Sequence, residues 1–229
     1  MSKFMTVRER GPELLDNFAD NEWSAIIWAC QTGNVPETWT VGSQKAMTIN
    51  GKDYGIDIIG LYHDDYADGS GKAPITFQMH DEYETMYAPH SSNTTVGGWG
   101  SCTMRTTTLP AIMATMPTEV QAAIREVNKK TAGASGSSTI QTTADKLFLL
   151  SEYEVFGART QSHAQEGEQY KYYPAGTGGN KIKNFNGSPY AWCERSPVGT
   201  AAYAVVGIYG TADVWQARDA SGVAFAFCF

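Results

Sequence analysis

The residues that could carry acid–base chemistry in this chain are few and scattered. None of its histidines belongs to an H-x-x-x-H or H-E-x-x-H pair, the spacing that places two zinc ligands on one face of a helix. One histidine stands beside carboxylates, in the triplet His80-Asp81-Glu82. A packing or surface role is favoured for this triplet over that of a general base. The four histidines are His63, His80, His90 and His163.

A cluster of acids at Asp64, Asp65 and Asp68, followed by Gly69, superficially resembles a calcium loop. An EF-hand loop needs alternating oxygen ligands and a glutamate at its twelfth position, whereas the twelfth residue counted from Asp64 is Ile75. The spacing favours a solvated turn over a weak metal site. Neither a metal nor a cofactor is therefore expected.

A second acid pair, Glu152 and Glu154, is predicted to alternate along a strand and so to share one face. A solvated strand face is favoured over glycosidase chemistry for this pair. The chain has no G-x-S-x-G elbow, Walker loop or G-x-G-x-x-G motif. We therefore expect no enzymatic activity. A carbohydrate-active hydrolase remains the alternative, which a clustered acid pair in a deep pocket would support.

Aromatic residues of the C-terminal third stand among Gly, Ser, Thr and Ala, a composition that binding loops use. Some of these rings must belong to the core, and we expect this of Trp192 and Phe225. Tyr203, Tyr209 and Trp215 are the better surface candidates. The full set is Tyr170, Tyr172, Tyr173, Tyr190, Trp192, Tyr203, Tyr209, Trp215 and Phe225.

The composition restricts the possible partners. The 229 residues carry a net charge of −7, and only 18% of them are charged. Basic residues form no cluster longer than a pair such as Lys129-Lys130. Binding to nucleic acid or to an anionic membrane surface is therefore disfavoured. Apolar runs fall far short of the roughly 20 residues that a membrane span needs. We expect neither nucleic-acid binding nor membrane insertion.

The sequence also indicates where the chain is made. Charged residues interrupt the first ten positions, where a signal peptide would need an apolar stretch. Synthesis and folding in a cytosol are therefore expected. Four widely spaced cysteines then favour buried, reduced thiols. A disulfide between Cys193 and Cys228 remains an alternative. The other two cysteines are Cys30 and Cys102.

Periodicity predicts two helical regions among many short strands. Trp23, Ile26, Ile27 and Cys30 lie on one face of a helix expected over 21–32, capped by Asp20-Asn21. Asn50-Gly51 predicts a hairpin with a return strand over 54–62. Further expected elements are a short helix over 109–116, a helix from Pro117 whose apolar face includes Val120, Ile124 and Val127, and strands over 139–143, 146–150 and the following 151–157.

The remaining segments are an arm and long loops. Residues 1–16 lack a clear period and are expected to form an N-terminal arm, which either docks on a neighbouring subunit or frays. Residues 17–229 are expected to form a single domain. Long polar stretches at 80–101 and 158–190 are typical of functional loops.

Several blocks of the sequence are distinctive when taken together: Gly60–Lys72, Ile75–Phe77, Gly97–Trp99, Met104–Thr106, Leu147–Gly157, Arg195–Pro197 and Gly222–Val223. With these blocks the chain resembles a domain-of-unknown-function family of gut bacteria and their phages. The similarity covers roughly residues 20–229, and its most specific block is Leu147–Gly157.

That resemblance implies an α+β, C-type-lectin-like fold, with two helices packed on short, mostly antiparallel strands joined by long loops. The same scaffold serves formylglycine-generating enzymes and the variable proteins of diversity-generating retroelements. In the variable proteins, the C-terminal strands and loops carry the ligand-binding residues. The chain lacks the closely spaced cysteines of the formylglycine-generating site, and Gly222–Phe227 lacks the Arg-Pro that the family has after Gly-Val.

The expected function is ligand binding as a phage virion protein, in a tail, fibre or display position. The ligand would be a host cell-surface protein or glycan. The alternatives are a capsid or tail decoration protein without receptor binding, and an adhesin on the bacterial cell surface. Assembly into a homo-oligomer, possibly a trimer, would add avidity, and the N-terminal arm would contact other virion proteins.

Specific residues are assigned to this function. Arg195 is expected to order the fold through hydrogen bonds, together with the buried rings of Trp192 and Phe225. The expected ligand contacts are Tyr190, Glu194, Tyr203, Tyr209, Asp213, Trp215, Gln216, Arg218 and Asp219.

Overall fold

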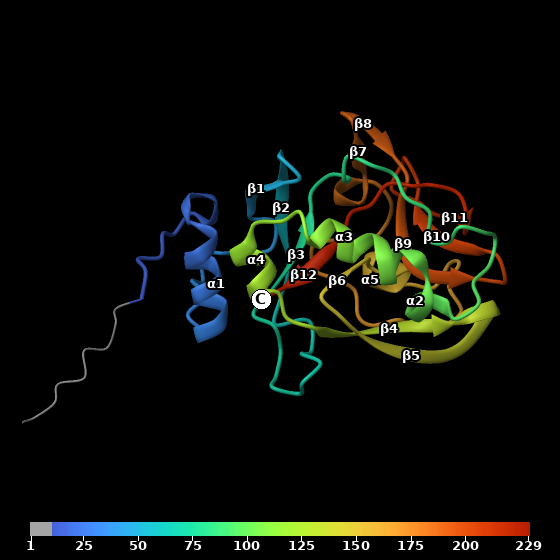
Figure 1. Cartoon of the computed structure of the whole chain (residues 1–229), viewed down its shortest axis with the longest axis horizontal. Helices are drawn as coiled ribbons and strands as arrows, with labels where there is room; N and C mark the ends of the chain where they lie inside the picture. Colours follow the sequence, from blue (N-terminus) through green and yellow to red (C-terminus); the bar gives the residue numbers. More distant parts are fainter. Residues whose placement is uncertain (1–10) are drawn as a thin grey trace, which may run out of the picture.

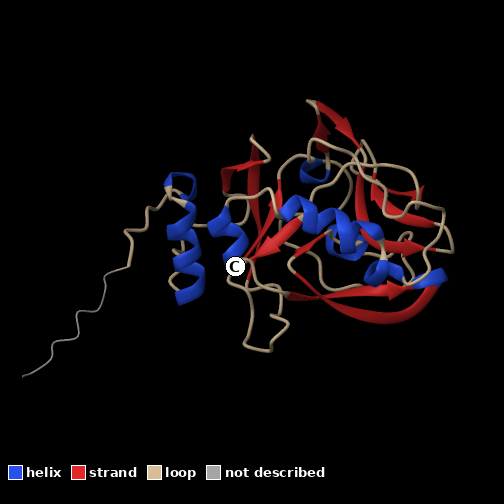
Figure 2. Cartoon of the chain, viewed as in Figure 1, coloured by secondary structure: helices blue, strands red, loops and turns tan. Residues whose placement is uncertain are grey.

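A computed structural model describes residues 11–229 and shows a mixed α+β protein with short helices among antiparallel strands (Figures 1 and 2). Its α-helices are α1 (Trp23–Thr32), α2 (Gly98–Ser101), α3 (Leu109–Met113), α4 (Thr118–Ala123) and α5 (Glu152–Phe156). Its strands are β1 (Gln44–Ile49), β2 (Lys52–Leu61), β3 (Ile75–Met79), β4 (Val127–Gly133), β5 (Ser137–Asp145), β6 (Leu147–Phe148), β7 (Lys183–Phe185), β8 (Ser188–Tyr190), β9 (Trp192–Val198), β10 (Ala202–Val206), β11 (Ala212–Gln216) and β12 (Ala226–Cys228).

The largest sheet has the order β1-β2-β3-β12-β6, with every neighbouring pair antiparallel. Its first two strands form the predicted hairpin, in which Asn50 and Gly51 both have positive φ. The final strand β12 lies between β3 and β6, so the C-terminus ends inside the molecule (Figure 1). Phe225, Phe227 and Phe229 are consequently fully buried.

Helix α1 confirms the first predicted helix, and its apolar face packs into the core. It begins at Trp23 rather than at residue 21, because the Asn21 side chain bonds the backbone of Leu15 instead of capping the helix. Gly33, in the left-handed region at φ 71°, ends the helix as predicted. Leu15 also accepts a hydrogen bond from the Trp39 indole, so the described part of the predicted arm is attached to the domain.

Three smaller sheets complete the fold. Strands β11-β10-β9 form an antiparallel sheet with β10 in the centre, and a β-bulge interrupts the β9–β10 register. Strands β4 and β5 form a long hairpin along one side of the molecule (Figure 1), and β7 pairs with β8. The three-stranded sheet is the element that carries most of the predicted ligand contacts.

Three expectations about secondary structure were wrong. The segment predicted as a strand over 151–157 is helix α5, because Ser151 and Glu154 form a reciprocal capping box. The helix predicted from Pro117 through Val127 ends at Ala123, since Arg125 pairs with Cys228 and Val127 starts β4. The described residues contain five short α-helices rather than two.

All four cysteines are buried free thiols, so the Cys193–Cys228 disulfide left open by the sequence is not formed. Burial raises the pKa of the Cys30 thiol to about 12. Burial likewise raises that of Cys102 to about 12, although the backbone N–H of Arg105 partly opposes this. These thiols remain protonated near neutral pH and behave as small apolar core residues.

Gly222, in the closing Gly222–Val223 block, lies where the chain passes directly over Glu82. An added Cβ would stand 1.8 Å from a carboxylate oxygen of Glu82, which is itself only 4% exposed. We therefore expect Gly222→Ala to lower the free energy of unfolding by about 1–3 kcal/mol, measured by urea denaturation. Gly100→Ala is the matched control, because its nearest neighbour would lie at an ordinary 3.7 Å.

The double variant Gly222→Ala/Glu82→Ala tests whether this contact is the cause. If the clash with the carboxylate destabilises the single variant, removing that carboxylate should recover part of the loss. Equal stability of Gly222→Ala and the unmodified chain would contradict the packing argument.

Candidate functional site

Seven of the nine predicted ligand contacts are at least partly exposed, and we call this set the C-terminal surface. Most of them lie on or around β11, the edge strand of its sheet, while Tyr190 ends β8. Tyr209, in the turn between β10 and β11, is the most exposed aromatic residue there, at 73%. The C-terminal surface consists of Tyr190, Tyr209, Asp213, Trp215, Gln216, Arg218 and Asp219.

Two rings of the C-terminal surface pack against each other. Tyr190 and Trp215 form an edge-to-face pair with centroids 5.9 Å apart, and both remain partly exposed. Phe185 extends the group, at 6.1 Å from Tyr190. An edge-to-face pair fixes the orientation of both rings, so their exposed edges form a rigid apolar contact area.

The turn that carries Tyr209 packs against the backbone around Gly178. A Cβ on Gly210 would lie 2.6 Å from the backbone nitrogen of Gly178, so the two segments are in close contact. Lys181, three residues after Gly178, accepts a hydrogen bond from the Trp192 indole through its carbonyl oxygen. The turn therefore rests on backbone that is tied to the core.

The polar part of the C-terminal surface includes a residue that sequence reasoning missed. Asn93 donates to the Gln216 side chain, and its Oδ1 accepts from the Arg218 backbone. Asn93 belongs to the loop over 80–101, which also bonds the C-terminal segment through the His90–Ala217 and Tyr87–Ser221 backbone pairs. Only the density of Asn, Ser and Thr in this loop could have indicated such a role.

Two predicted contacts, Glu194 and Tyr203, are wrong, because both side chains are buried. Glu194 lies on β9, a strand that is covered on both faces, and is 0% exposed. Tyr203 is on the central strand β10, 1% exposed, with its ring 6.1 Å from that of His90. Neither side chain can reach a ligand at the surface.

The three residues predicted to be structural are all fully buried. Arg195 makes the most extensive contacts: its guanidinium forms a fork with Glu154, at 2.5 and 2.9 Å. It also donates to the carbonyl oxygens of Leu149, Lys130 and Glu166. Such a fork is rigid and strong in a buried setting.

Lys129 extends this cluster into a buried ionic network. Its ammonium group lies 2.6 Å from Asp64, 2.7 Å from Glu154 and 3.0 Å from the Tyr170 hydroxyl. Burial alone would raise the pKa of Asp64, but the charges of Lys129 and His63 and the hydrogen bonds from Lys129 and Thr76 together outweigh it and lower that pKa to about 2. For Glu154, likewise, burial is outweighed by Arg195 and then Lys129, which lower its pKa.

The acid pair considered for glycosidase chemistry is fully engaged in the scaffold. Glu152 accepts from three successive backbone N–H groups, those of Thr160, Gln161 and Ser162, at 2.7–3.1 Å. Glu154 bonds Arg195 and Lys129 as described. Both carboxylates are buried, so this arrangement supports a role in fixing the loop over 158–190.

The polar triplet at 80–82 forms contacts that the sequence did not indicate. His80 Nδ1 lies 2.8 Å from Asp57, and this hydrogen bond raises the pKa of His80. The Tyr172 hydroxyl donates to the same carboxylate at 2.5 Å. The partner residue Asp57 is 23 positions away on β2, so only the fold brings this group together.

The acidic turn after β2 is held by cations of the protein itself. Lys72 pairs with Asp65 at 3.0 Å, and Arg125 pairs with Asp68 at 2.6 Å.

Over residues 11–229 there is no group of three or more His, Cys, Asp or Glu side chains with metal-binding geometry. No helix in the same range is long and apolar enough to cross a bilayer.

Comparison with known proteins gives a family. The model of a domain of unknown function (DUF6273) matches residues 76–228, which covers the strands from β3 to β12 and therefore the whole C-terminal surface. No curated protein and no solved structure matches the chain. This stretch spans more than half of the sequence, and the chain accordingly belongs to the DUF6273 family.

Proposed function

We propose that this protein is a ligand-binding component of a phage particle, which recognises a protein or glycan on the host cell surface through the C-terminal surface. The observation that carries the proposal is the exposure of three aromatic rings around β11: Tyr209 in the turn before this strand, and the Tyr190–Trp215 pair, of which Trp215 lies on it. Tyrosine and tryptophan supply large contact areas at low conformational cost, and they dominate binding energy at interfaces.

The chemistry around the rings suits a polar ligand. Asp213, Gln216, Arg218 and Asp219 are exposed and offer both donors and acceptors. Acidic and basic groups alternate within a few residues, so the surface carries no single strong charge. A protein or glycan with hydroxyl and amide groups would match it better than a polyanion.

The scaffold supports recognition by fixed geometry. The Arg195–Glu154 fork and the Lys129 contact tie α5 to β9 and to β4, and β9 is the opposite edge of the sheet that ends in β11. A binding surface on rigid elements loses less entropy when a ligand binds. We further propose that the fold is C-type-lectin-like, in line with the resemblance of the sequence blocks and the mixed antiparallel architecture.

The double variant Tyr209→Ala/Trp215→Ala tests the recognition proposal. Alanine substitution at a hot-spot aromatic residue costs about 2 kcal/mol or more, so the pair should weaken adsorption to host cells by about 100-fold or more. Adsorption is measured with fluorescently labelled protein and candidate host cells. Tyr62→Ala is the matched control, because Tyr62 is 56% exposed and lies outside the C-terminal surface.

A shortened chain tests assembly separately from recognition. Removing residues 1–10 leaves Leu15 and its bonds to Asn21 and Trp39 in place, so the domain should remain folded. Loss of particle incorporation with retained adsorption would support docking through the arm. Unchanged adsorption by the double aromatic variant would contradict receptor binding through the C-terminal surface. The alternative of a decoration protein without receptor binding would then be favoured.

A further inference from the structure

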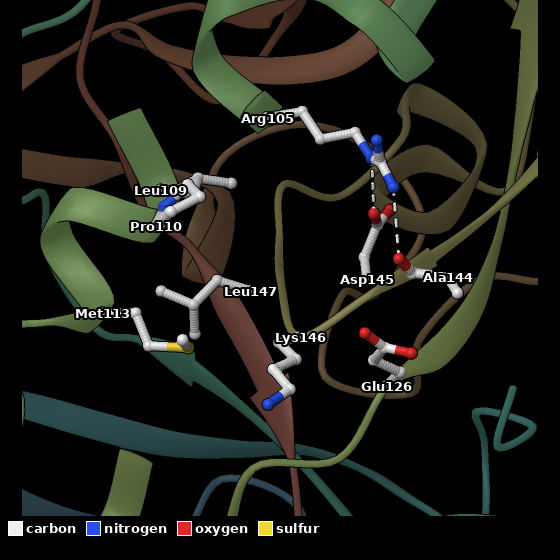
Figure 3. A pocket seen from close by; sticks show the side chains of 9 residues that line it. All are labelled: Arg105, Leu109, Pro110, Met113, Glu126, Ala144, Asp145, Lys146 and Leu147. Atoms are coloured by element: carbon white, nitrogen blue, oxygen red, sulfur yellow. Dashed lines mark hydrogen bonds and ion pairs between the residues drawn. The ribbon is translucent and has the colours of Figure 1, made fainter. Parts of the chain in front are cut away.

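A cavity of about 220 Å³ lies between α3, the end of β5 and the start of β6 (Figure 3). Its apolar wall consists of Leu109, Pro110, Met113 and Leu147. The cavity is smaller than the roughly 300–1,000 Å³ of pockets for drug-sized ligands, so an occupant must be small. The apolar wall fits an aliphatic group of a few carbons.

One end of the cavity is lined by the ion pair of Arg105 and Asp145, whose polar groups are occupied by contacts within the protein. Arg105 Nε donates to Asp145 at 2.6 Å, and its other nitrogens donate to the carbonyl oxygens of Gly100 and Ala144 (Figure 3). Asp145 also accepts from the Trp99 indole at 2.8 Å. The charges of Arg105 and Asp145 therefore neutralise each other and leave little attraction for an ion.

The other charged residues of the cavity are Lys146 and Glu126. Both are exposed, and neither side chain forms a hydrogen bond or ion pair with the residues described here, 11–229. The same two residues also line an adjoining hollow of about 330 Å³, beside Arg125 and Asp68. They thus stand where the apolar cavity opens, as one free cation and one free anion.

We propose that this cavity binds a free α-amino acid with an aliphatic side chain, such as leucine or methionine. Glu126 would accept from the α-ammonium group and Lys146 would donate to the α-carboxylate. The aliphatic side chain would fill the space beside Leu109, Met113 and Leu147. A ligand with one charge would leave one of the two residues unpaired, whereas a zwitterion pairs with both. This site is separate from the C-terminal surface.

Titration of the full chain with L-leucine, followed by ¹H–¹⁵N NMR, tests the proposal. We expect saturable shifts of the Met113, Glu126 and Lys146 amides at millimolar leucine. The comparison ligands 4-methylpentanoate and 3-methylbutylamine each lack one charge and should bind about tenfold more weakly. Similar affinity for either of them would overturn the zwitterion assignment.

Variants locate the site. Glu126→Gln and Lys146→Met should each weaken leucine binding by about tenfold, and Met113→Trp should abolish it by filling the cavity. All three positions are exposed or partly exposed, so the variants should fold, which thermal unfolding checks. Lys171→Met, an exposed lysine outside the cavity, is the control. Absence of shifts in the unmodified chain, or unchanged binding in the three variants, would overturn the proposal.

Discussion

Replacing Arg195 with methionine is expected to lower the free energy of unfolding by about 3–5 kcal/mol, which is a large fraction of the roughly 5–15 kcal/mol that stabilises a typical domain. The guanidinium is fully buried and bonds both oxygens of Glu154. Its removal would leave the Glu154 carboxylate with Lys129 as its remaining cationic partner. Equilibrium urea unfolding, followed by tryptophan fluorescence, measures the loss.

Two further variants distinguish the buried pair from a general effect of losing an arginine. Arg218→Met removes an exposed arginine and should change stability by no more than about 0.5 kcal/mol. Arg195→Met/Glu154→Gln removes both charges of the fork and should recover part of the loss, because no buried anion is then left with an incomplete set of partners. A loss below about 1 kcal/mol for Arg195→Met would show that the network contributes little to stability.

Local signals in the sequence correctly predict the elements whose conformation depends on residues close together in the chain. The Asn50-Gly51 hairpin follows from the need for positive φ in a two-residue turn. Helix α1 follows from its apolar period and from Gly33 at its end.

The errors concern residues whose surroundings come from distant parts of the chain. Glu194 is a predicted surface contact, yet β9 is covered on both faces and buries it without a partner among the described residues, which is rare for a charged side chain. The ionic network joins Asp64, Lys129, Glu154 and Arg195, whose separations in sequence no periodicity encodes. Helix α5 is a different case, because the Ser-x-x-Glu capping signal that marks its start is local and is present in the sequence.

The C-terminal segment therefore combines a buried strand and an exposed strand of one sheet, which follow each other closely in sequence. Strand β9 supplies the buried Trp192 and Arg195, whereas β11 and its flanking turns supply the exposed residues. Changes in β11 would leave the ionic network untouched, because none of its side chains belongs to that network. This separation supports a surface that can vary in sequence while the scaffold is retained, as the proposed recognition function requires.

Glu194→Met is expected to stabilise the protein, and increasingly so as the pH rises above 4.5. Both oxygens of Glu194 are buried without a partner among the described residues. Burial, followed by the nearby Glu152 and Glu166 carboxylates, raises the pKa of Glu194 well above its ordinary value of 4.5. Below pH 4.5 the carboxyl is neutral in both states and has no pH-dependent effect on stability. Above it, the unfolded chain releases a proton that the folded chain retains, which favours unfolding.

The linkage fixes the size of this effect. Each pH unit between 4.5 and the folded-state pKa of Glu194 lowers the free energy of unfolding by about 1.4 kcal/mol, so the gain for Glu194→Met is expected to grow with pH over this range. Methionine has a similar length and no polar atom to leave unpaired. Stability of both proteins is measured by urea unfolding from pH 5 to pH 8, a range that begins just above the ordinary pKa of a glutamate.

The difference between the two stability curves reports Glu194 together with its effect on the neighbouring carboxylates Glu152 and Glu166, because the remaining titrating groups are common to both proteins. Glu194→Gln should give the same pH dependence as Glu194→Met with a smaller gain, since its amide leaves buried donors unpaired. Glu37→Met, at an exposed glutamate, should leave the curve unchanged. A difference between Glu194→Met and the unmodified chain that stays constant from pH 5 to pH 8 would mean that Glu194 ionises in the folded protein as readily as in the unfolded chain. Its burial on β9 would then not keep the carboxyl neutral.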